Sequence, residues 1–292
     1  MKVAVVGSRG QYGSEIVKEF RNGHDVIELT TERLDITDYN SCAELKKLNP
    51  DVIVNAALFY KTENPDQYAS QTFAVNAIGA MNLAKVSRET GAINIYISTD
   101  SVFNGRTAVP YKEDDRPSPI NTYGISKYAG ELYTMQGPRH YIIRSSSMFG
   151  VAGSRTKNGS NFVDSMVKKA ERGEPIELVS DLFMSPTYAK DAAIAIRKIV
   201  EGKLPFGTYH AVNSGHCSWY DFARQIFETG NIRANLKPVK AEDQKTDMER
   251  PKFTVLDNSK LKGHGIEMRR WDSALRDYMI EKGYINKSVS RN

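Results

Sequence analysis

The chain opens with a short apolar segment, residues 2–6, that runs directly into a loop containing three glycines at positions 7, 10 and 13. Glycines in such a loop allow a tight turn, a close approach of the backbone to a pyrophosphate and close packing of a helix on a strand. The following helix, predicted over residues 11–20, would offer its free N–H groups to anionic oxygens. The segment therefore predicts a dinucleotide-binding loop, with a purely structural turn as the alternative. The cofactor contacts predicted here are Gly7, Arg9, Gly10, Gln11, Tyr12 and Gly13.

Short apolar segments alternate with helical stretches through the first half of the chain, as in βαβ units with a parallel sheet. After about residue 150 the pattern becomes irregular. We predict an α/β protein with a Rossmann-type doubly wound parallel sheet and a smaller C-terminal substrate-binding domain. The NAD(P)-binding domain is predicted over residues 1–150 with a returning segment near 185–205, and residues 151–292 are predicted to be mainly substrate-binding. Strands are predicted over 2–6, 25–29, 51–55, 93–97 and 140–144, and helices over 11–20, 65–90, 161–172 and 189–200.

The composition excludes several classes of function. The 292 residues are 40% hydrophobic and 26% charged, and the net charge of +5 comes from basic residues scattered among 35 acidic ones, so we expect no nucleic-acid partner. No apolar run approaches the roughly 20 residues that span a bilayer, and no signal peptide precedes the first strand, so we expect no membrane association and a cytoplasmic location. The two cysteines and five histidines form no metal-binding spacing, and we expect no catalytic metal.

A tyrosine and a lysine four residues apart, Tyr123 and Lys127, indicate carbonyl chemistry. On a helix they share one face, so both side chains can reach one substrate atom, and the ammonium is expected to lower the pKa of the phenol. Such a phenol can give a proton to a developing alkoxide. Thr99 precedes them at the carboxyl end of a strand, where open α/β sheets bind ligands. The same spacing recurs at Tyr278 and Lys282, where we expect an ordinary helix surface.

The end of the second strand bears on the choice of cofactor. A carboxylate at this position would bind the ribose hydroxyls and repel a 2′-phosphate, but residues 29–31 contain none. Arg9 and Arg33 could instead pair with a 2′-phosphate, although both could simply be solvated. We therefore predict NADPH as the cofactor, with NADH as the alternative. The further predicted cofactor contacts are Thr30, Arg33, Asp35, Ile36, Asn55, Ala56 and Ala57, together with Tyr123 and Lys127.

Over nearly its whole length the chain resembles the extended short-chain dehydrogenases/reductases and, within them, the dTDP-4-dehydrorhamnose reductase family. The order of the matching segments is specific for the family and less specific for the exact sugar. The segments are Gly10-Gln11-Tyr12-Gly13, Leu34-Asp35-Ile36-Thr37, Asn55-Ala56-Ala57, Val75-Asn76-Ala77-Ile78-Gly79-Ala80, Ile97-Ser98-Thr99-Asp100, Tyr123-Gly124-Ile125-Ser126-Lys127, Asn161-Phe162-Val163, Ser185-Pro186-Thr187 and Arg250-Pro251.

The resemblance implies NADPH-dependent reduction of the 4-keto group of a nucleotide-linked 6-deoxyhexose, with dTDP-4-dehydro-L-rhamnose as the expected substrate and dTDP-L-rhamnose as the product. Tyr123 would protonate the oxygen, Lys127 would lower the pKa of the tyrosine and hold the nicotinamide ribose, and Thr99 would hydrogen-bond the carbonyl. The substrate-binding residues implied are Thr99, Asp100, Asn161 and Arg250. For Asn161 a helix cap, and for Arg250 a surface arginine, are the simpler interpretations. A homodimer is the family expectation.

The chain departs from the family pattern at three places that we expect near the substrate. Lys61-Thr62-Glu63 replaces the usual Val-Asp, Ser147 replaces an aromatic residue, and Met184 replaces a glycine. Losing an aromatic surface would change how a sugar or base packs, so a related reductase or epimerase for another sugar or nucleotide is an alternative.

Two further alternatives concern the class of function. A non-catalytic regulatory subunit could keep the fold and the cofactor, although it would not need Thr99, Tyr123 and Lys127 together. Dehydratases on the same fold usually carry an acidic pair after the threonine. Here Ser101 follows Asp100, which speaks against dehydration but leaves epimerisation open.

Overall fold

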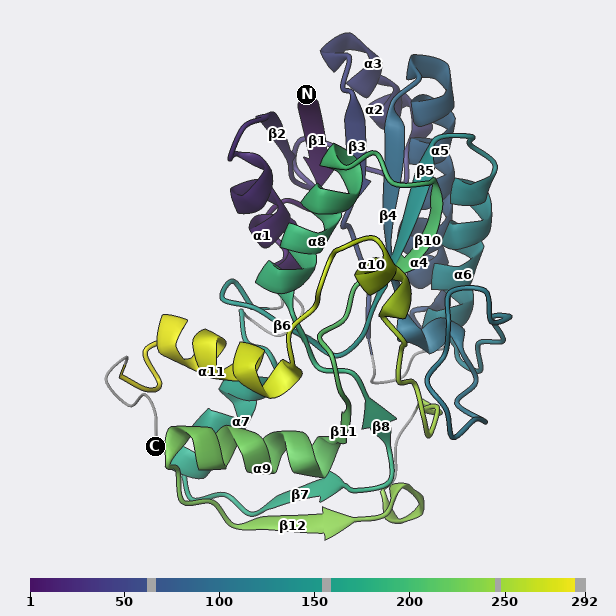
Figure 1. Cartoon of the computed structure of the whole chain (residues 1–292). Coiled ribbons are helices and arrows are strands. Elements are labelled where there is room, and N and C mark those ends of the chain that lie inside the picture. The colour runs from purple at the N-terminus through teal and green to yellow at the C-terminus, as the bar shows by residue number, and fades with distance from the viewer. Residues whose placement is uncertain (62–66, 154–158, 245–247, 287–292) are drawn as a thin grey trace.

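The computed structural model describes residues 1–61, 67–153, 159–244 and 248–286 (Figure 1). Its centre is a six-stranded sheet, parallel throughout, in the order β10-β5-β4-β3-β1-β2. From β1 the chain passes to β2 on one side and then to β3 on the other, so the winding reverses at β1. This confirms the predicted doubly wound α/β fold. The strands are β1 (Lys2–Val6), β2 (Asp25–Leu29), β3 (Val52–Asn55), β4 (Ile93–Thr99), β5 (His140–Ser145) and β10 (Gly207–His210).

Helices cover both faces of the sheet (Figure 1). Helices α1 (Gln11–Phe20) and α8 (Ala189–Glu201) pack with Val3 and Val5 in one core, whereas α5 (Gly79–Thr90) packs with Ala4 and Val6 in another. This division follows from the strand geometry, because successive side chains of β1 point to opposite faces. Helix α6 (Thr122–Met135) lies beside α5, and the short helices α2 (Tyr39–Ala43) and α3 (Leu45–Leu48) follow β2.

Most of the chain from β6 onward builds a second, smaller part below the carboxyl ends of the strands, whereas α8 and β10 return to the large sheet (Figure 1). Its own core contains Phe149, Phe222, Trp271 and Leu275. Three short pairs of strands support it, β6 with β9, β7 with β12 and β8 with β11. Its elements are β6 (Met148–Phe149), α7 (Phe162–Glu171), β7 (Ile176–Val179), β8 (Phe183–Met184), β9 (Thr187–Tyr188), β11 (Cys217–Ser218), α9 (Trp219–Gly230), β12 (Leu236–Val239) and α11 (Trp271–Glu281). Helix α10 (Ser259–Gly263) instead packs on β10 and places Leu261 in the core of the large sheet.

The helical stretch predicted over 65–90 is interrupted. After α4 (Ala69–Phe73) comes one π-helical turn, Ala74–Ile78, before α5 begins at Gly79. Residues 65 and 66 lie outside the described ranges. The wider turn carries Asn76, whose side chain is 1% exposed. Such π-helical insertions occur frequently at functional sites.

Tyr278 lies on a helix, α11, as expected, but the expectation of an ordinary surface there is wrong. Its side chain is fully buried, and its hydroxyl donates a hydrogen bond to Asp164 Oδ1 at 2.6 Å. The reason is that Ala274, Leu275, Tyr278 and Met279 form one stripe along α11 that packs into the second core.

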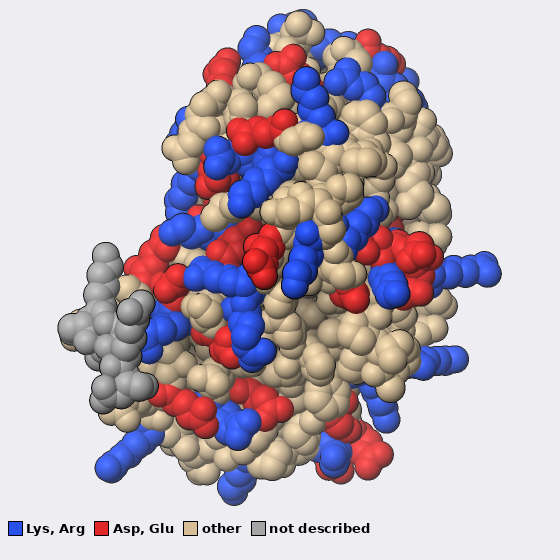
Figure 2. All heavy atoms as spheres, viewed as in Figure 1, with Lys and Arg blue, Asp and Glu red and all other residues tan. Residues whose placement is uncertain are grey.

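Lys and Arg side chains alternate with Asp and Glu across the face of the molecule in Figure 2. Within the described ranges no helix is both long enough and apolar enough to cross a membrane.

Candidate active site

Thr99 and Tyr123 meet at the carboxyl edge of the sheet, where β4 ends and α6 begins. Asn121 starts α6 by accepting a hydrogen bond from the Gly124 N–H at 2.8 Å. A Cβ at Gly124 would lie 2.2 Å from the carbonyl oxygen of Ser101, so the glycine lets the helix lie close to the end of β4. A hydrogen bond joins the side chains of Tyr123 and Thr99. The structure thus brings these two predicted residues together.

Lys127 lies one turn further along α6 and is 2% exposed. Its ammonium donates a hydrogen bond to the carbonyl oxygen of Ile97 at 2.6 Å and lies 4.0 Å from the centre of the Tyr96 ring. Burial lowers the pKa of Lys127 to about 7, because the charged form loses its hydration. A backbone carbonyl and an aromatic face therefore hold the nitrogen below the end of β4.

The expected lowering of the Tyr123 pKa by Lys127 is wrong for this structure. Burial raises the pKa of Tyr123 above its usual range, and its hydrogen bond with Thr99 offsets this only in part. The ammonium of Lys127 is directed at Ile97 instead, so desolvation dominates. The phenol is consequently held in its protonated form at neutral pH.

Asp100 connects this site to the segment that follows β5. Its buried carboxylate accepts hydrogen bonds from Thr99 Oγ1 at 3.0 Å and from Ser146 Oγ at 2.6 Å. Burial raises the pKa of Asp100, and these hydrogen bonds counteract the rise. Asp100 thereby fixes the orientation of the Thr99 side chain.

Tyr60 also belongs to this site, and the sequence reasoning missed it. Its ring meets that of Tyr123 edge-on, with the centroids 4.5 Å apart and the planes at 62°. Burial raises the pKa of Tyr60, the nearby Arg250 guanidinium lowers it, and Asp100 raises it. The only available signal was an aromatic residue shortly after the strand that ends at Asn55.

The glycine loop has the geometry that its sequence predicts. Gly7 adopts a left-handed conformation, φ 75°, and a Cβ there would lie 2.8 Å from the backbone nitrogen of Ala57. A Cβ at Gly13 would lie 2.1 Å from the carbonyl oxygen of Gly7, so α1 can lie this close only with glycine there. The buried Ser8 Oγ and Gln11 Oε1 have no hydrogen-bond partner among the described residues. The Ser8 hydroxyl and the free N–H groups at the N-terminus of α1 can donate to phosphate oxygens, so this backbone cradle fits the phosphates of a dinucleotide, whereas Gln11 Oε1 is an acceptor and would need a donor.

The remaining predicted cofactor contacts lie around the same loop. The N–H groups of Gly7 and Ser8 both lie within hydrogen-bonding distance of the Leu29 carbonyl oxygen, which ties the loop to the end of β2 beside the buried Thr30. Asn55 Oδ1 accepts from the Ala57 N–H at 3.2 Å. Ala56 and Ala57 border Gly7, and Ile36 packs on Gly79. Arg9 and Arg33 are exposed, and the Asp35 carboxylate accepts a hydrogen bond from the Thr37 hydroxyl. Tyr12 is buried, with its hydroxyl 3.5 Å from Ser145 Oγ.

The two predicted substrate anchors have different surroundings. Asn161 caps α7 by accepting from the Asp164 N–H at 3.1 Å, and its amide donates to Tyr278 and to the Gly150 carbonyl oxygen. Its side chain is therefore occupied within the protein, as in a structural helix cap. Arg250 is exposed and lines a pocket of about 450 Å³. The charged residues that line this pocket are Arg106, Glu242, Glu249, Arg250 and Lys252.

The three departures from the family pattern also lie in different surroundings. Met184 is 2% exposed and packs in the second core. Ser147 is partly buried and adopts a left-handed backbone conformation, φ 43°. Lys61 is exposed, and Thr62 and Glu63 lie outside the described residues.

Known proteins resemble this chain over nearly all its length. Residues 1–283 match the family model described as RmlD substrate binding domain. The spore coat polysaccharide biosynthesis protein SpsK of Bacillus subtilis is 38% identical, over 96% of this chain and 98% of its own length. The dTDP-4-dehydrorhamnose reductase of Mycolicibacterium smegmatis is 33% identical, over 94% of this chain and 84% of its own length.

A solved structure agrees with these sequence matches. The dTDP-4-dehydrorhamnose reductase of Bacillus anthracis, crystallised in complex with NADP, superimposes with a TM-score of 0.90 at 34% identity and covers 96% of this chain and 99% of its own. The chain belongs to the RmlD substrate binding domain family of extended short-chain dehydrogenases/reductases, the family of the dTDP-4-dehydrorhamnose reductases.

Proposed function

We propose that this protein reduces the 4-keto group of a nucleotide-linked 4-keto-6-deoxyhexose with NADPH, converting dTDP-4-dehydro-L-rhamnose to dTDP-L-rhamnose. The observation that carries the proposal is the convergence of Thr99, Tyr123 and Lys127 at the carboxyl edge of the sheet, beside a glycine loop built for a dinucleotide. The family relationship supports it, because relatives of similar length bear the name of this reductase.

In this mechanism NADPH, when bound, supplies the hydride that attacks the keto carbon. Tyr123 then gives its proton to the oxygen that becomes the alcohol, and solvent returns a proton to the phenolate. Because the pKa of Tyr123 is raised, the phenol keeps its proton until the strongly basic alkoxide develops. Thr99 would hold the carbonyl oxygen within reach of Tyr123 by turning its hydroxyl proton from Asp100 Oδ1 to the substrate.

Lys127 has a separate part in this proposal. Its nitrogen is fixed by Ile97 and Tyr96, and within the described part of the chain it donates to the carbonyl oxygen of Ile97. An ammonium has three donors, so further donors are available for the ribose of the nicotinamide nucleotide. Its pKa of about 7 makes the charge on this group sensitive to what binds beside it.

The preference for NADPH follows from the charges around β2. The strand ends in Leu29, followed by Thr30 instead of a carboxylate, and the exposed Arg9 and Arg33 lie in the loop and just after the strand. A guanidinium is well shaped to pair with a 2′-phosphate. Arg33 Nη1 donates to the Glu28 carbonyl oxygen at 3.0 Å, which holds this side chain beside β2.

Arg250 is the substrate anchor in this proposal, with Asp100 and Thr99 at the reacting end. Residues 1–150, together with the segment that returns to the sheet as α8, would hold the cofactor, and the rest would mainly hold the sugar nucleotide. A homodimer and a cytoplasmic location stay predictions.

The test is the loss of NADPH absorbance with a panel of dTDP-, UDP-, GDP- and CDP-linked 4-keto-6-deoxyhexoses. We expect turnover with a dTDP sugar, and a loss of about 100- to 10,000-fold in Tyr123→Phe, the range for general acid catalysis. Turnover with another nucleotide only would correct the substrate. Tight NADPH binding without turnover on any of them would favour the regulatory or epimerase alternatives.

A further inference from the structure

Tyr60 is packed against the tyrosine that the proposed reaction uses as its acid. The edge-on contact between the rings, at 4.5 Å and 62°, is an arrangement that aromatic pairs prefer. A tyrosine side chain that is free to turn about χ1 would carry its hydroxyl to several places. The ring of Tyr60 occupies one side of Tyr123 and removes part of that freedom.

The backbone next to Tyr60 is itself held in place by Asn76. Asn76 Oδ1 accepts from the Phe59 N–H at 2.9 Å, and Asn76 Nδ2 donates to the Phe59 carbonyl oxygen at 2.9 Å. This pair of hydrogen bonds reproduces one rung of a β-ladder with a side-chain amide. Because Asn76 is buried in the π-helical turn, the segment after β3 is fixed to the interior.

The same amide reaches the helix that carries Tyr123. Asn76 Nδ2 also donates to Ser126 Oγ at 3.0 Å, and the Ser126 hydroxyl donates to the carbonyl oxygen of Tyr123 at 2.7 Å. The backbones of residues 59 and 123 are thus joined through two side chains, those of Asn76 and Ser126, and the rings of Tyr60 and Tyr123 close the loop. This closed circuit of contacts ties the backbone at residue 59 to the backbone at residue 123 and so fixes the two rings relative to each other.

Two charged groups of the proposed substrate site act on the Tyr60 hydroxyl. The Arg250 guanidinium lowers the pKa of Tyr60 and the Asp100 carboxylate raises it. Tyr60 is therefore within the electrostatic reach of both the proposed anchor and the proposed reacting end.

We propose that Tyr60 is a positioning residue for Tyr123, and that Asn76 holds it there. This inference rests on the proposed function, because it assigns Tyr60 a part in proton donation by Tyr123. The ring of Tyr60 sets the direction of the catalytic hydroxyl and keeps water from it, whereas the hydroxyl of Tyr60 is dispensable for this task.

The test compares Tyr60→Ala with Tyr60→Phe, using the nucleotide sugar that the wild type turns over. We expect kcat to fall about tenfold or more in Tyr60→Ala with a smaller change in KM, because proton donation loses its alignment. Tyr60→Phe keeps the ring and should retain kcat within about threefold. Asn76→Ala should lower kcat in the same direction as Tyr60→Ala.

The pH profile supplies a readout that a merely structural role would not change. The titratable groups around Tyr123 are Tyr60, Tyr96 and Asp100, with Lys127 one turn along α6. Water admitted by Tyr60→Ala should weaken the desolvation that raises the pKa of Tyr123. The basic limb of the kcat profile, where the acid loses its proton, should then move to lower pH, and it should move further in Tyr60→Ala than in Tyr60→Phe, which removes only the charge effect of the Tyr60 phenol and keeps the ring.

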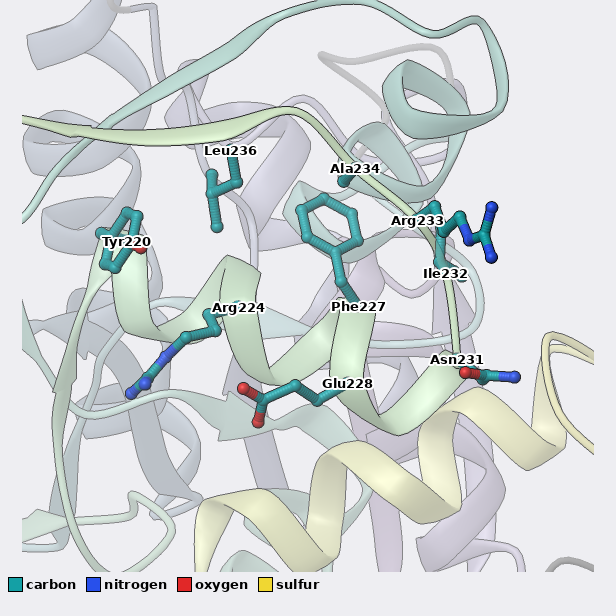
Figure 3. Close-up of a pocket in the computed structure, with 9 residues that line it drawn as sticks. All are labelled: Tyr220, Arg224, Phe227, Glu228, Asn231, Ile232, Arg233, Ala234 and Leu236. Atoms are coloured by element: carbon teal, nitrogen blue, oxygen red, sulfur yellow. The ribbon is translucent and has the colours of Figure 1, made fainter.

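A matched control is Tyr220→Ala, which removes another partly buried tyrosine ring. Tyr220 lies in a groove between α9 and β12, together with Phe227 and Leu236, and has no part in the proposed site (Figure 3). It should leave kcat and the pH profile unchanged. NADPH binding and the melting temperature of each variant check that the fold is kept.

The outcomes separate the two proposals. If Tyr123→Phe abolishes turnover while Tyr60→Ala keeps both kcat and the basic limb, the positioning role is wrong and the reductase stands. If Tyr60→Phe loses as much kcat as Tyr60→Ala, the hydroxyl matters and the inference is also overturned. A wild type that reduces no nucleotide sugar would overturn both.

Discussion

The ammonium of Lys127 donates a hydrogen bond to the carbonyl oxygen of Ile97 at 2.6 Å. This contact places a cation under the end of β4 in a position that is 2% exposed. A buried ammonium destabilises a fold unless it is compensated, and here a carbonyl oxygen and the face of Tyr96 compensate it in part. The lost hydration that these contacts do not replace lowers the pKa of Lys127 to about 7.

The first prediction concerns stability and pH in Lys127→Met. The pKa of Lys127 falls from 10.5 to about 7 on folding, so the unfolded chain binds more protons between these values and stability rises with pH there. The destabilisation caused by burying the charged ammonium is fully present below pH 7 and vanishes above pH 10.5. Without added cofactor, Lys127→Met should be the more stable protein by a few kcal/mol at pH 6, at about 1.4 kcal/mol per pKa unit. Urea unfolding of both proteins from pH 6 to pH 10 should show this advantage shrinking. A constant difference would contradict it.

The second prediction compares two glycines with the same backbone conformation. Gly7 and Gly91 have φ of 75° and 74°, but an added Cβ meets the backbone of Ala56 and Ala57 at Gly7 and open space at Gly91. Gly91→Ala should therefore cost only the conformational strain, about 1–2 kcal/mol. Gly7→Ala should cost more and should weaken NADPH binding at least tenfold, because the loop must shift. Fluorescence titration with NADPH measures the second effect, and equal affinities in the two variants would count against the phosphate cradle.

The third prediction is that Asn161 matters for stability and not for substrate binding. Asn161→Ala removes the cap of α7 and leaves the buried Tyr278 and Asp164 with fewer partners, at a cost of about 1–3 kcal/mol. The melting temperature should fall while KM for the sugar nucleotide stays near the wild-type value. A rise in KM without loss of stability would restore Asn161 as a substrate anchor.

The fourth prediction is that Arg250, unlike Asn161, matters for substrate binding and not for stability. Its side chain is exposed and lines the pocket of about 450 Å³, so Arg250→Ala should change the stability little. Losing a charged hydrogen bond to the diphosphate, about 1.5–3 kcal/mol, should raise KM by roughly 10- to 100-fold. Arg250→Lys keeps the charge and should recover part of the loss. Unchanged KM in Arg250→Ala would place the anchor elsewhere.

The fifth prediction concerns a buried ion pair behind the site. Arg144 and Glu131 are 2% and 0% exposed, joined by two hydrogen bonds at 2.8 and 2.9 Å, and Ser98 Oγ donates to the same carboxylate. Arg144→Met leaves the Glu131 charge buried alone and should destabilise the protein by about 3–5 kcal/mol. Glu44 forms an exposed ion pair with Lys47, and Glu44→Ala should change the unfolding free energy little. Similar effects for the two variants in urea unfolding would contradict this reading.

The sequence by itself determined the sheet and the loop at its edge. Strands 2–6 and 25–29 and helix 11–20 were predicted with the bounds that the structure has. These segments are specified locally, by short apolar runs, a glycine at each tight approach and a helix period of 3.6. The same local signals placed Thr99 at a strand end and Tyr123 and Lys127 on one helix.

Tertiary structure decided the environment of each of these residues. Whether Lys127 lowers the pKa of Tyr123 depends on where its nitrogen points, and that was set by the carbonyl of Ile97 and the ring of Tyr96. Tyr278 looked like a surface residue because the partners that bury it, Asn161 and Asp164, lie more than a hundred residues away. Tyr60 carries no motif and was found only from its contact with Tyr123. Desolvation, charge pairing and ring packing depend on residues far apart in the chain, which no local pattern encodes.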